Sequence, residues 1–85
     1  MRIFITKPAQ KQLDKLPHGT RKKVYRQFAT FRENPRHPSL QIKKMANSPY
    51  HEGRIDIHYR FRFLWQDDDI YIVSVGTHDT GLGKK

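Results

Sequence analysis

The sequence contains no cysteine, so disulfide bonds and thiolate metal sites are excluded from the outset. It has no apolar run long enough to span a membrane, and no signal peptide precedes its first apolar segment. A chain of 85 residues without disulfides is typical of a cytoplasmic protein rather than a secreted one. The sequence therefore predicts a single cytoplasmic domain spanning residues 1–85, with residues 80–85 as a mobile tail and no membrane partner.

Acidic residues are also scarce. The chain has 17 lysines and arginines against 8 aspartates and glutamates, which gives a formal net charge of +9. Residues 1–50 alone hold twelve of the basic residues and only two of the acids. Such an excess favours an anionic partner, and nucleic acid is the first candidate. An acidic protein surface fits the same charge, and the plainest alternative is a solvated basic surface that keeps the protein soluble.

The first half of the chain predicts a strand followed by a helical hairpin. Residues 2–6 are short and rich in β-formers. Thr6 is expected to cap the helix that follows. Apolar residues then recur at helical spacing in two segments that Pro17-His18-Gly19 separates. The two apolar stripes are Ala9, Leu13 and Leu16, then Val24, Phe28 and Phe31.

The second half predicts strands. Residues 40–45 alternate weakly, residues 53–65 alternate strongly, and residues 70–75 are the most β-branched run of the chain. Gln66 and the three aspartates after it form the expected hairpin turn, and Trp65 and Tyr71 beside it are expected in the core. The predicted fold is α+β with the order β-α-α-β-β-β, in which an N-terminal strand and a helical hairpin pack on a mainly antiparallel, twisted sheet.

Residues 54–63 form the longest alternation in the chain. Read as one strand, this segment places its isoleucines and aromatic residues on one face and its polar residues on the other. The polar face would carry Arg54, Asp56, His58, Arg60 and Arg62. Three arginines and a histidine on one face indicate a surface that holds an anion.

The best phosphate-binding candidate is Arg60, because a guanidinium stays charged and binds phosphate through two parallel hydrogen bonds. The alternative is an ion pair with Asp56 or Glu52. His78, after the last expected strand, titrates near neutrality and suits a general acid or base, unless it is simply exposed. His58 is a second proton-transfer candidate or a surface residue, and Arg54 is expected to assist catalysis.

Further basic residues are candidates for contact with an RNA backbone, although a solvated surface is the plainer interpretation. They are Arg62, Lys43 and Lys44 in the strand region, and Arg21, Lys22, Lys23 and Arg26 on the second helix. Histidines can act as general acid and base, and arginines can stabilise negative charge that develops on a phosphate, without a metal. No metal site and no cofactor are expected.

The ordered elements, with Tyr59-Arg60 leading one strand and Gly76-Thr77-His78 closing the last, resemble the RelE/ParE superfamily of type II toxin-antitoxin systems. The match runs from Arg2 to about Asp79. It implies a toxin held in a hetero-oligomeric complex by a cognate antitoxin. RelE-like members cleave mRNA in the ribosomal A site beside ribosomal RNA, whereas ParE-like members poison DNA gyrase. The Gly76-Thr77-His78 segment is closer to the nuclease branch, particularly to YafQ-like toxins.

The chain departs from the nuclease pattern at its end. RelE-like nucleases often carry a catalytic aromatic residue in the C-terminal tail, where this chain has only Leu82 as a large apolar side chain. Three functions therefore stand beside one another. They are a ribosome-dependent mRNA endonuclease, a ParE-like gyrase inhibitor, and a catalytically degenerate member that binds RNA or antitoxin.

Overall fold

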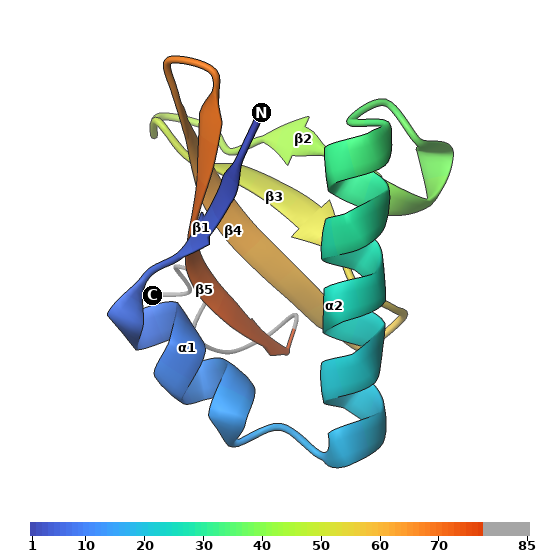
Figure 1. The fold of residues 1–85 in the computed structure, drawn as a ribbon. Coiled ribbons are helices and arrows are strands. Elements are labelled where there is room, and N and C mark those ends of the chain that lie inside the picture. The colour runs from blue at the N-terminus through green and yellow to red at the C-terminus, as the bar shows by residue number, and fades with distance from the viewer. Residues whose placement is uncertain (78–85) are drawn as a thin grey trace.

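The computed structural model describes residues 1–77 and shows two helices packed on one five-stranded sheet (Figure 1). The strands are β1 (Ile3–Ile5), β2 (Lys43–Lys44), β3 (His51–Arg54), β4 (Tyr59–Gln66) and β5 (Asp69–Thr77). The helices are α1 (Lys7–Asp14), α2 (His18–Glu33) and a short 3-10 turn, η1 (Pro38–Leu40). The predicted α+β class is confirmed. The predictions for His78 and for the tail 80–85 lie outside the described residues.

The sheet has the strand order β1-β5-β4-β3-β2. β1 pairs with β5 in parallel, and every other pairing is antiparallel, as expected for a mainly antiparallel sheet. β1 is only three residues long, so it joins β5 over Ile70 to Ile72. Beyond Ile72, Gln12 of α1 provides a hydrogen-bond acceptor in place of β1. Its Oε1 accepts the Val75 N–H at 2.8 Å. The first helix thereby satisfies the edge of β5 that β1 leaves open.

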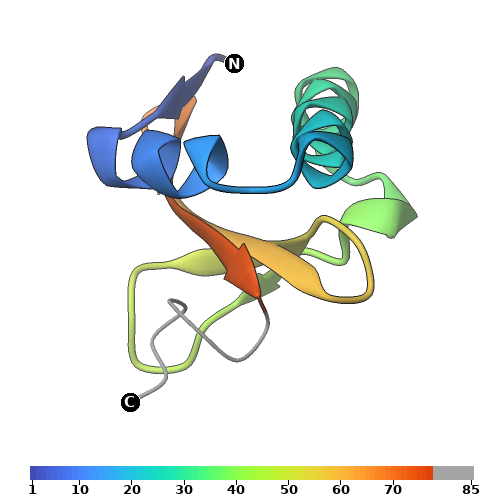
Figure 2. The same cartoon turned by 90° about the horizontal axis from the view of Figure 1, so that it is seen from below.

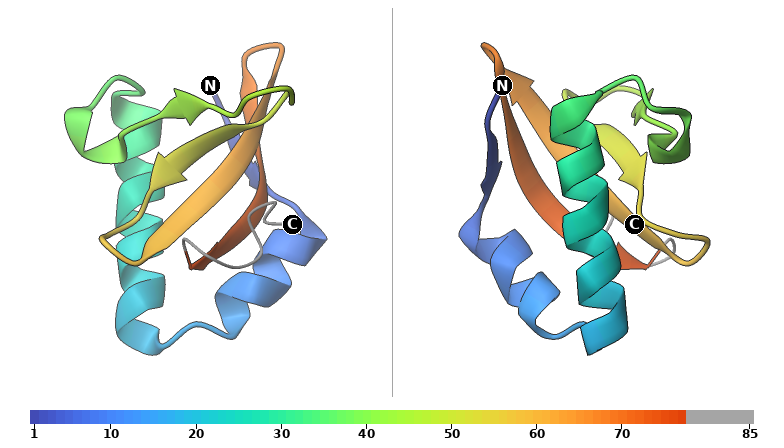
Figure 3. Two further views of the ribbon diagram at one scale, coloured as in Figure 1. Left: turned by 180° about the vertical axis from the view of Figure 1, so that it is seen from behind. Right: turned by 45° about the vertical axis from the view of Figure 1, so that its right-hand side comes forward.

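Both helices lie on the same face of the sheet (Figure 2). The predicted apolar stripes supply the buried side of each helix: Ala9 and Leu13 in α1, and Val24, Phe28 and Phe31 in α2. Phe31 packs against Phe61 and Phe63 of β4, with ring centroids 5.8 and 5.0 Å apart. No helix of residues 1–77 covers the opposite face of the sheet (Figure 3, left). Thr6 stands at the α1 N-cap, but its hydroxyl donates to Ile72 O and not to the helix.

The prediction of one continuous strand over residues 54–63 is wrong, because the chain reverses direction at residues 55–58. β3 ends at Arg54, β4 begins at Tyr59, and the two strands pair with each other. Asp56 closes the turn, since its Oδ1 accepts the backbone N–H groups of His58 and Tyr59 at 2.8 and 2.9 Å. Ile57 is therefore 68% exposed at the turn and does not join the apolar face. One predicted strand is thus two.

Two smaller predictions also need correction. Trp65 is 41% exposed and lies at the margin of the core, although it was expected inside it. Residues 40–45 form only the two-residue strand β2, because Leu40 is buried in η1 and Gln41 turns the chain with a φ of 46°. The most β-branched run does form a strand, β5, which lies between β1 and β4 with Ile70, Ile72 and Val75 buried.

None of the described helices is both long and apolar enough to cross a membrane.

Candidate phosphate-binding site

Arg54 and Arg60 form a cross-strand pair at the turn end of the β3–β4 hairpin, where β3 ends and β4 begins. The register places Arg54 directly opposite Arg60, and Arg62 follows two residues along β4 on the same face. This is the face without helices, since Phe61 between the two arginines is buried under α2. The expectation that Arg54, Arg60 and Arg62 share one face is thus correct, although they come from two strands. Opposed like charges cost free energy unless an anion lies between them.

Arg60 is held by the turn and not by a carboxylate. Its Nη1 donates to the backbone oxygens of Asp56 and Tyr59 at 2.6 and 3.1 Å. The expected alternative, an ion pair with Asp56 or Glu52, is absent among the described residues, whose ion pairs are Arg2–Asp69, Lys23–Asp56 and Lys43–Glu52. One edge of the guanidinium is therefore fixed to the protein. No carboxylate among the described residues neutralises its charge.

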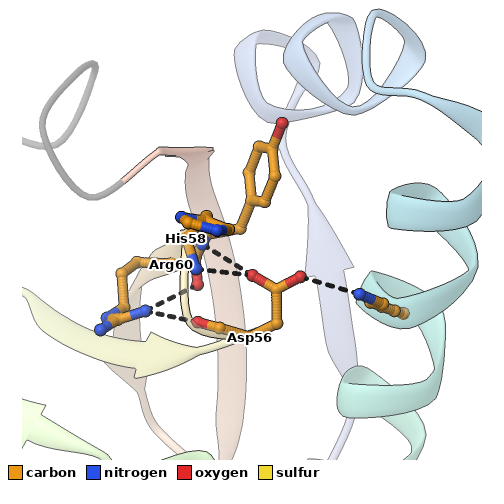
Figure 4. Close-up of polar contacts among 5 residues, drawn as sticks. Asp56, His58 and Arg60 are labelled. Atoms are coloured by element: carbon orange, nitrogen blue, oxygen red, sulfur yellow. Dashed lines mark hydrogen bonds and ion pairs between the residues drawn. The ribbon is translucent and has the colours of Figure 1, made fainter.

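Asp56 organises this end of the hairpin (Figure 4). Its Oδ1 binds the two turn N–H groups, and its Oδ2 accepts from Nζ of Lys23 on α2 at 3.2 Å. Partial burial raises the pKa of the carboxyl, but the hydrogen bonds from His58 N–H, Lys23 and Tyr59 N–H outweigh burial and lower the pKa below its ordinary value. The carboxylate thus stays charged in the folded protein. Its charge is shared with Lys23 and the turn amides, away from Arg60.

His58 lies in the turn and not on a strand, which corrects its expected place on the polar strand face. Its imidazole is exposed, and its backbone N–H is bound by Asp56. Figure 4 shows His58 grouped with Asp56 and Arg60 at the same end of the hairpin. The exposed imidazole of His58 is therefore open to solvent at the same end of the hairpin as Arg60.

Arg62 differs from the other two arginines because it is covered. Its Nε and Nη2 atoms are buried without a hydrogen-bond partner among the described residues. Its guanidinium carbon lies 5.8 Å from the ring centroid of Tyr50. Ser74, its cross-strand neighbour on β5, also has a buried hydroxyl without a partner there. Arg62 therefore contributes positive charge beneath the surface rather than an open contact.

The remaining RNA-binding candidates divide by what their side chains already bind. Lys23 is paired with Asp56, Lys43 lies 3.7 Å from the buried Glu52, Lys44 donates to Ser48 O, and Arg21 donates to Asp14 O. Lys22 and Arg26 are exposed on α2, and no contact is recorded for their side chains among the described residues. The structure therefore leaves Lys22 and Arg26 as the most available basic side chains of the predicted helical group.

The C-terminal end of β5 lies beside the start of β4, next to Arg60. Gly76 pairs with Arg60, and Thr77 pairs with Tyr59. His78 follows Thr77 directly in the sequence and lies outside the described residues.

The sequence did not identify Asp56 as the cap of the turn or Lys23 as its partner. The available signal was an aspartate two residues before His58, a spacing at which a carboxylate often binds the backbone N–H. Among residues 1–77 there is no group of three side chains able to hold a metal.

Comparison with known proteins identifies the fold. No protein-family model and no curated protein sequence matches the chain. Among solved structures, YafQ from E. coli superposes with a TM-score of 0.76 at 11% identity, covering 95% of this chain and 97% of that one. The archaeal RelE–RelB complex from Pyrococcus horikoshii contains a chain with a TM-score of 0.74 at 19% identity, over 94% and 97% of the two chains.

A third structure extends the same result. The E. coli RelBE toxin-antitoxin complex contains a chain with a TM-score of 0.70 at 20% identity, over 88% of this chain and 93% of that one. The class that fold and site define is a small, basic α+β domain with arginines on the open face of its sheet. Within that class, this chain has the fold of the RelE-like toxins.

Proposed function

We propose that the chain is the toxin of a type II toxin-antitoxin system and acts in the cytoplasm as a ribosome-dependent mRNA endonuclease. The fold is shared with structures described as RelE, YafQ and the RelBE toxin-antitoxin complex. By the same likeness, its protein partner would be a cognate antitoxin in a hetero-oligomeric complex. The positive charge favours an acidic segment of that antitoxin.

The observation that carries the nuclease proposal is the Arg54–Arg60 pair. The two arginines are direct cross-strand partners on β3 and β4, and neither has a carboxylate partner among the described residues. A purely structural surface would neutralise such a pair, because like charges at this spacing repel. An mRNA phosphate between them removes the repulsion and places its charge where the phosphorane develops.

The proposed reaction needs no metal. Arg60 and Arg54 bind the scissile phosphate and stabilise the charge that builds on its oxygens. One of His78 and His58 takes the proton of the ribose 2′-hydroxyl, and the other returns a proton to the leaving 5′ oxygen. The 2′ oxygen–phosphorus bond forms as the 5′ oxygen–phosphorus bond breaks. The products are a 2′,3′-cyclic phosphate and a 5′-hydroxyl.

The decisive test is to map the 5′ ends of cellular mRNA after brief induction of the chain. In-frame cuts in translated messages are expected, and Arg60→Ala and His78→Ala should each reduce them at least about a hundredfold, the scale of losing a charge-stabilising group or a proton donor. Arg36→Ala is the matched control, because it removes one exposed positive charge away from the site.

Other outcomes of the same experiment separate the remaining functions. Growth arrest without mRNA cuts would eliminate the nuclease and direct attention to DNA gyrase, the target of ParE-like toxins. Neither arrest nor cuts, from a chain that is folded and expressed, would identify a member that binds RNA or antitoxin without cleaving.

A further inference from the structure

We infer that Asp56 is a positioning residue, which holds Arg60 in place for phosphate through the turn that it caps, while Lys23 on α2 holds Asp56. This inference rests on the proposed function, because it concerns the same phosphate-binding site. It assigns to Asp56 a role different from the one that its sequence neighbourhood suggests, namely an ion-pair partner of Arg60.

The first step is the turn itself. Asp56 Oδ1 accepts from both His58 N and Tyr59 N, and Tyr59 O in turn accepts from the backbone N–H groups of Ile55 and Asp56 at 3.0 and 3.3 Å. These bonds fix the carbonyl oxygens of Asp56 and Tyr59 at the turn of the hairpin. Those are the two oxygens to which Nη1 of Arg60 donates.

The second step concerns charge. A carboxylate beside a phosphate-binding arginine normally competes with the phosphate for it. Here the carboxylate of Asp56 is already bound by two backbone amides and by Lys23. The atom of Asp56 to which Arg60 donates is the backbone oxygen and not the carboxylate. The aspartate therefore orients the guanidinium without neutralising it.

The third step is the link to α2. Lys23 lies 33 residues before Asp56 and joins it across the hairpin end. On the same side, Gln27 Nε2 donates to the backbone oxygen of Arg54 at 2.8 Å. Two side chains one helical turn apart on α2 thus hold the last residue of β3 and the cap of the turn. The spacing of Arg54 and Arg60 is set from the helix as well as from the sheet.

The test substitutes Asp56 in the wild-type chain and again in the Arg60→Lys variant. For each full-length variant, kcat/KM of mRNA cleavage is measured in a translating extract. Asp56→Ala should reduce it about tenfold to a hundredfold, the effect of misplacing a binding group by about an ångström. Asp56→Asn keeps an oxygen acceptor for the turn and should lose less. In Arg60→Lys, which cannot form the same fork, adding Asp56→Ala should cause no loss beyond about twofold.

The control is Asp68→Ala, which removes an exposed carboxylate from the β4–β5 turn and should leave cleavage unchanged. Independent losses that multiply in Arg60→Lys with Asp56→Ala would overturn the inference, and so would an Asp56→Ala variant as active as Asp68→Ala. Both results would leave the nuclease proposal intact, whereas wild-type protein without cleavage overturns the nuclease proposal itself.

If Asp56→Ala does not fold, a measurement on the wild-type chain tests whether the guanidinium of Arg60 is held in place. In ¹⁵N NMR spectra, the anchored guanidinium of Arg60 should show restricted rotation and slowed exchange of its Nη hydrogens, whereas Arg54 should show averaged signals. Arg54→Lys and Arg60→Lys assign the two side chains. Equally averaged signals from both arginines would overturn the inference.

Discussion

At the residue scale, the close approach of Gly53 and Phe61 determines how β3 lies beside β4. The two are cross-strand partners, and a Cβ built on Gly53 would lie 2.3 Å from Cζ of Phe61. The ring covers the place where a side chain would stand and contacts Phe28 and Phe31 of α2. A glycine is needed there because the buried ring has no room to move away.

Gly53→Ala is therefore expected to destabilise the fold by about 1–3 kcal/mol, the usual cost of overpacking a core. The free energy of unfolding in urea measures the effect. Gly19→Ala is the matched control, because nothing lies within 4 Å of its Cβ position in α2 and alanine is the better helix former. Equal stabilities of Gly53→Ala and the wild type would contradict the account of this contact.

At the scale of elements, the sequence predicted which residues share a face better than it predicted where strands end. Even spacing places Arg54 and Arg60 on one face of a straight strand. In the hairpin they share a face because the register pairs them directly. The reversal itself was hidden, because Ile57 continues the apolar alternation while Asp56 caps a turn. Local side-chain hydrogen bonding outweighed periodicity at that point.

The register of β5 could not be predicted for a related reason. Phe61 pairs with Val75 and Phe63 pairs with Ile72, so β5 has one more residue than β4 across this stretch. This bulge brings Ile72 and Val75 to the same buried face at a spacing that alternation forbids. The run from Ile70 to Val75 is apolar or small on both faces, so its sequence contains no marker for the shift.

Aromatic side chains make the contact between α2 and β4, and Phe31 takes part in three of these ring contacts. Its ring is fully buried and contacts Phe61, Phe63 and Trp65. Phe31→Ala should cost about 3–5 kcal/mol, since it leaves a cavity between the layers. Urea denaturation and amide exchange should show α2 losing protection first. Tyr25→Ala, at a half-exposed position on the same helix, is the control and should cost far less.

At the scale of the whole molecule, the net charge of +9 should govern RNA affinity through counterion release. For a short single-stranded RNA, we expect the logarithm of affinity to fall linearly with the logarithm of salt concentration. Replacing both Lys22 and Arg26 by glutamine should make the slope shallower by about 1.4, at about 0.7 for each lost phosphate contact.

Fluorescence anisotropy titrations at several salt concentrations measure these slopes. Lys7→Gln, which removes one exposed charge at the start of α1, should change the slope less. An unchanged slope in the Lys22 and Arg26 variant would mean that α2 does not face the RNA.

The pairing of β1 with β5 has a consequence for the order in which the protein is made. The first strand of the sheet binds the last, and the backbone of Ile70 donates to Arg2 across nearly the whole described chain. While the chain is being synthesised, the N-terminal strand and both helices have no completed sheet on which to pack, because the loop that joins β1 to β5 must close first. The core therefore assembles only after β5 has emerged from the ribosome. Every truncated product that stops before Ile70 lacks the strand with which β1 pairs, so abortive translation yields no complete sheet to support the candidate site.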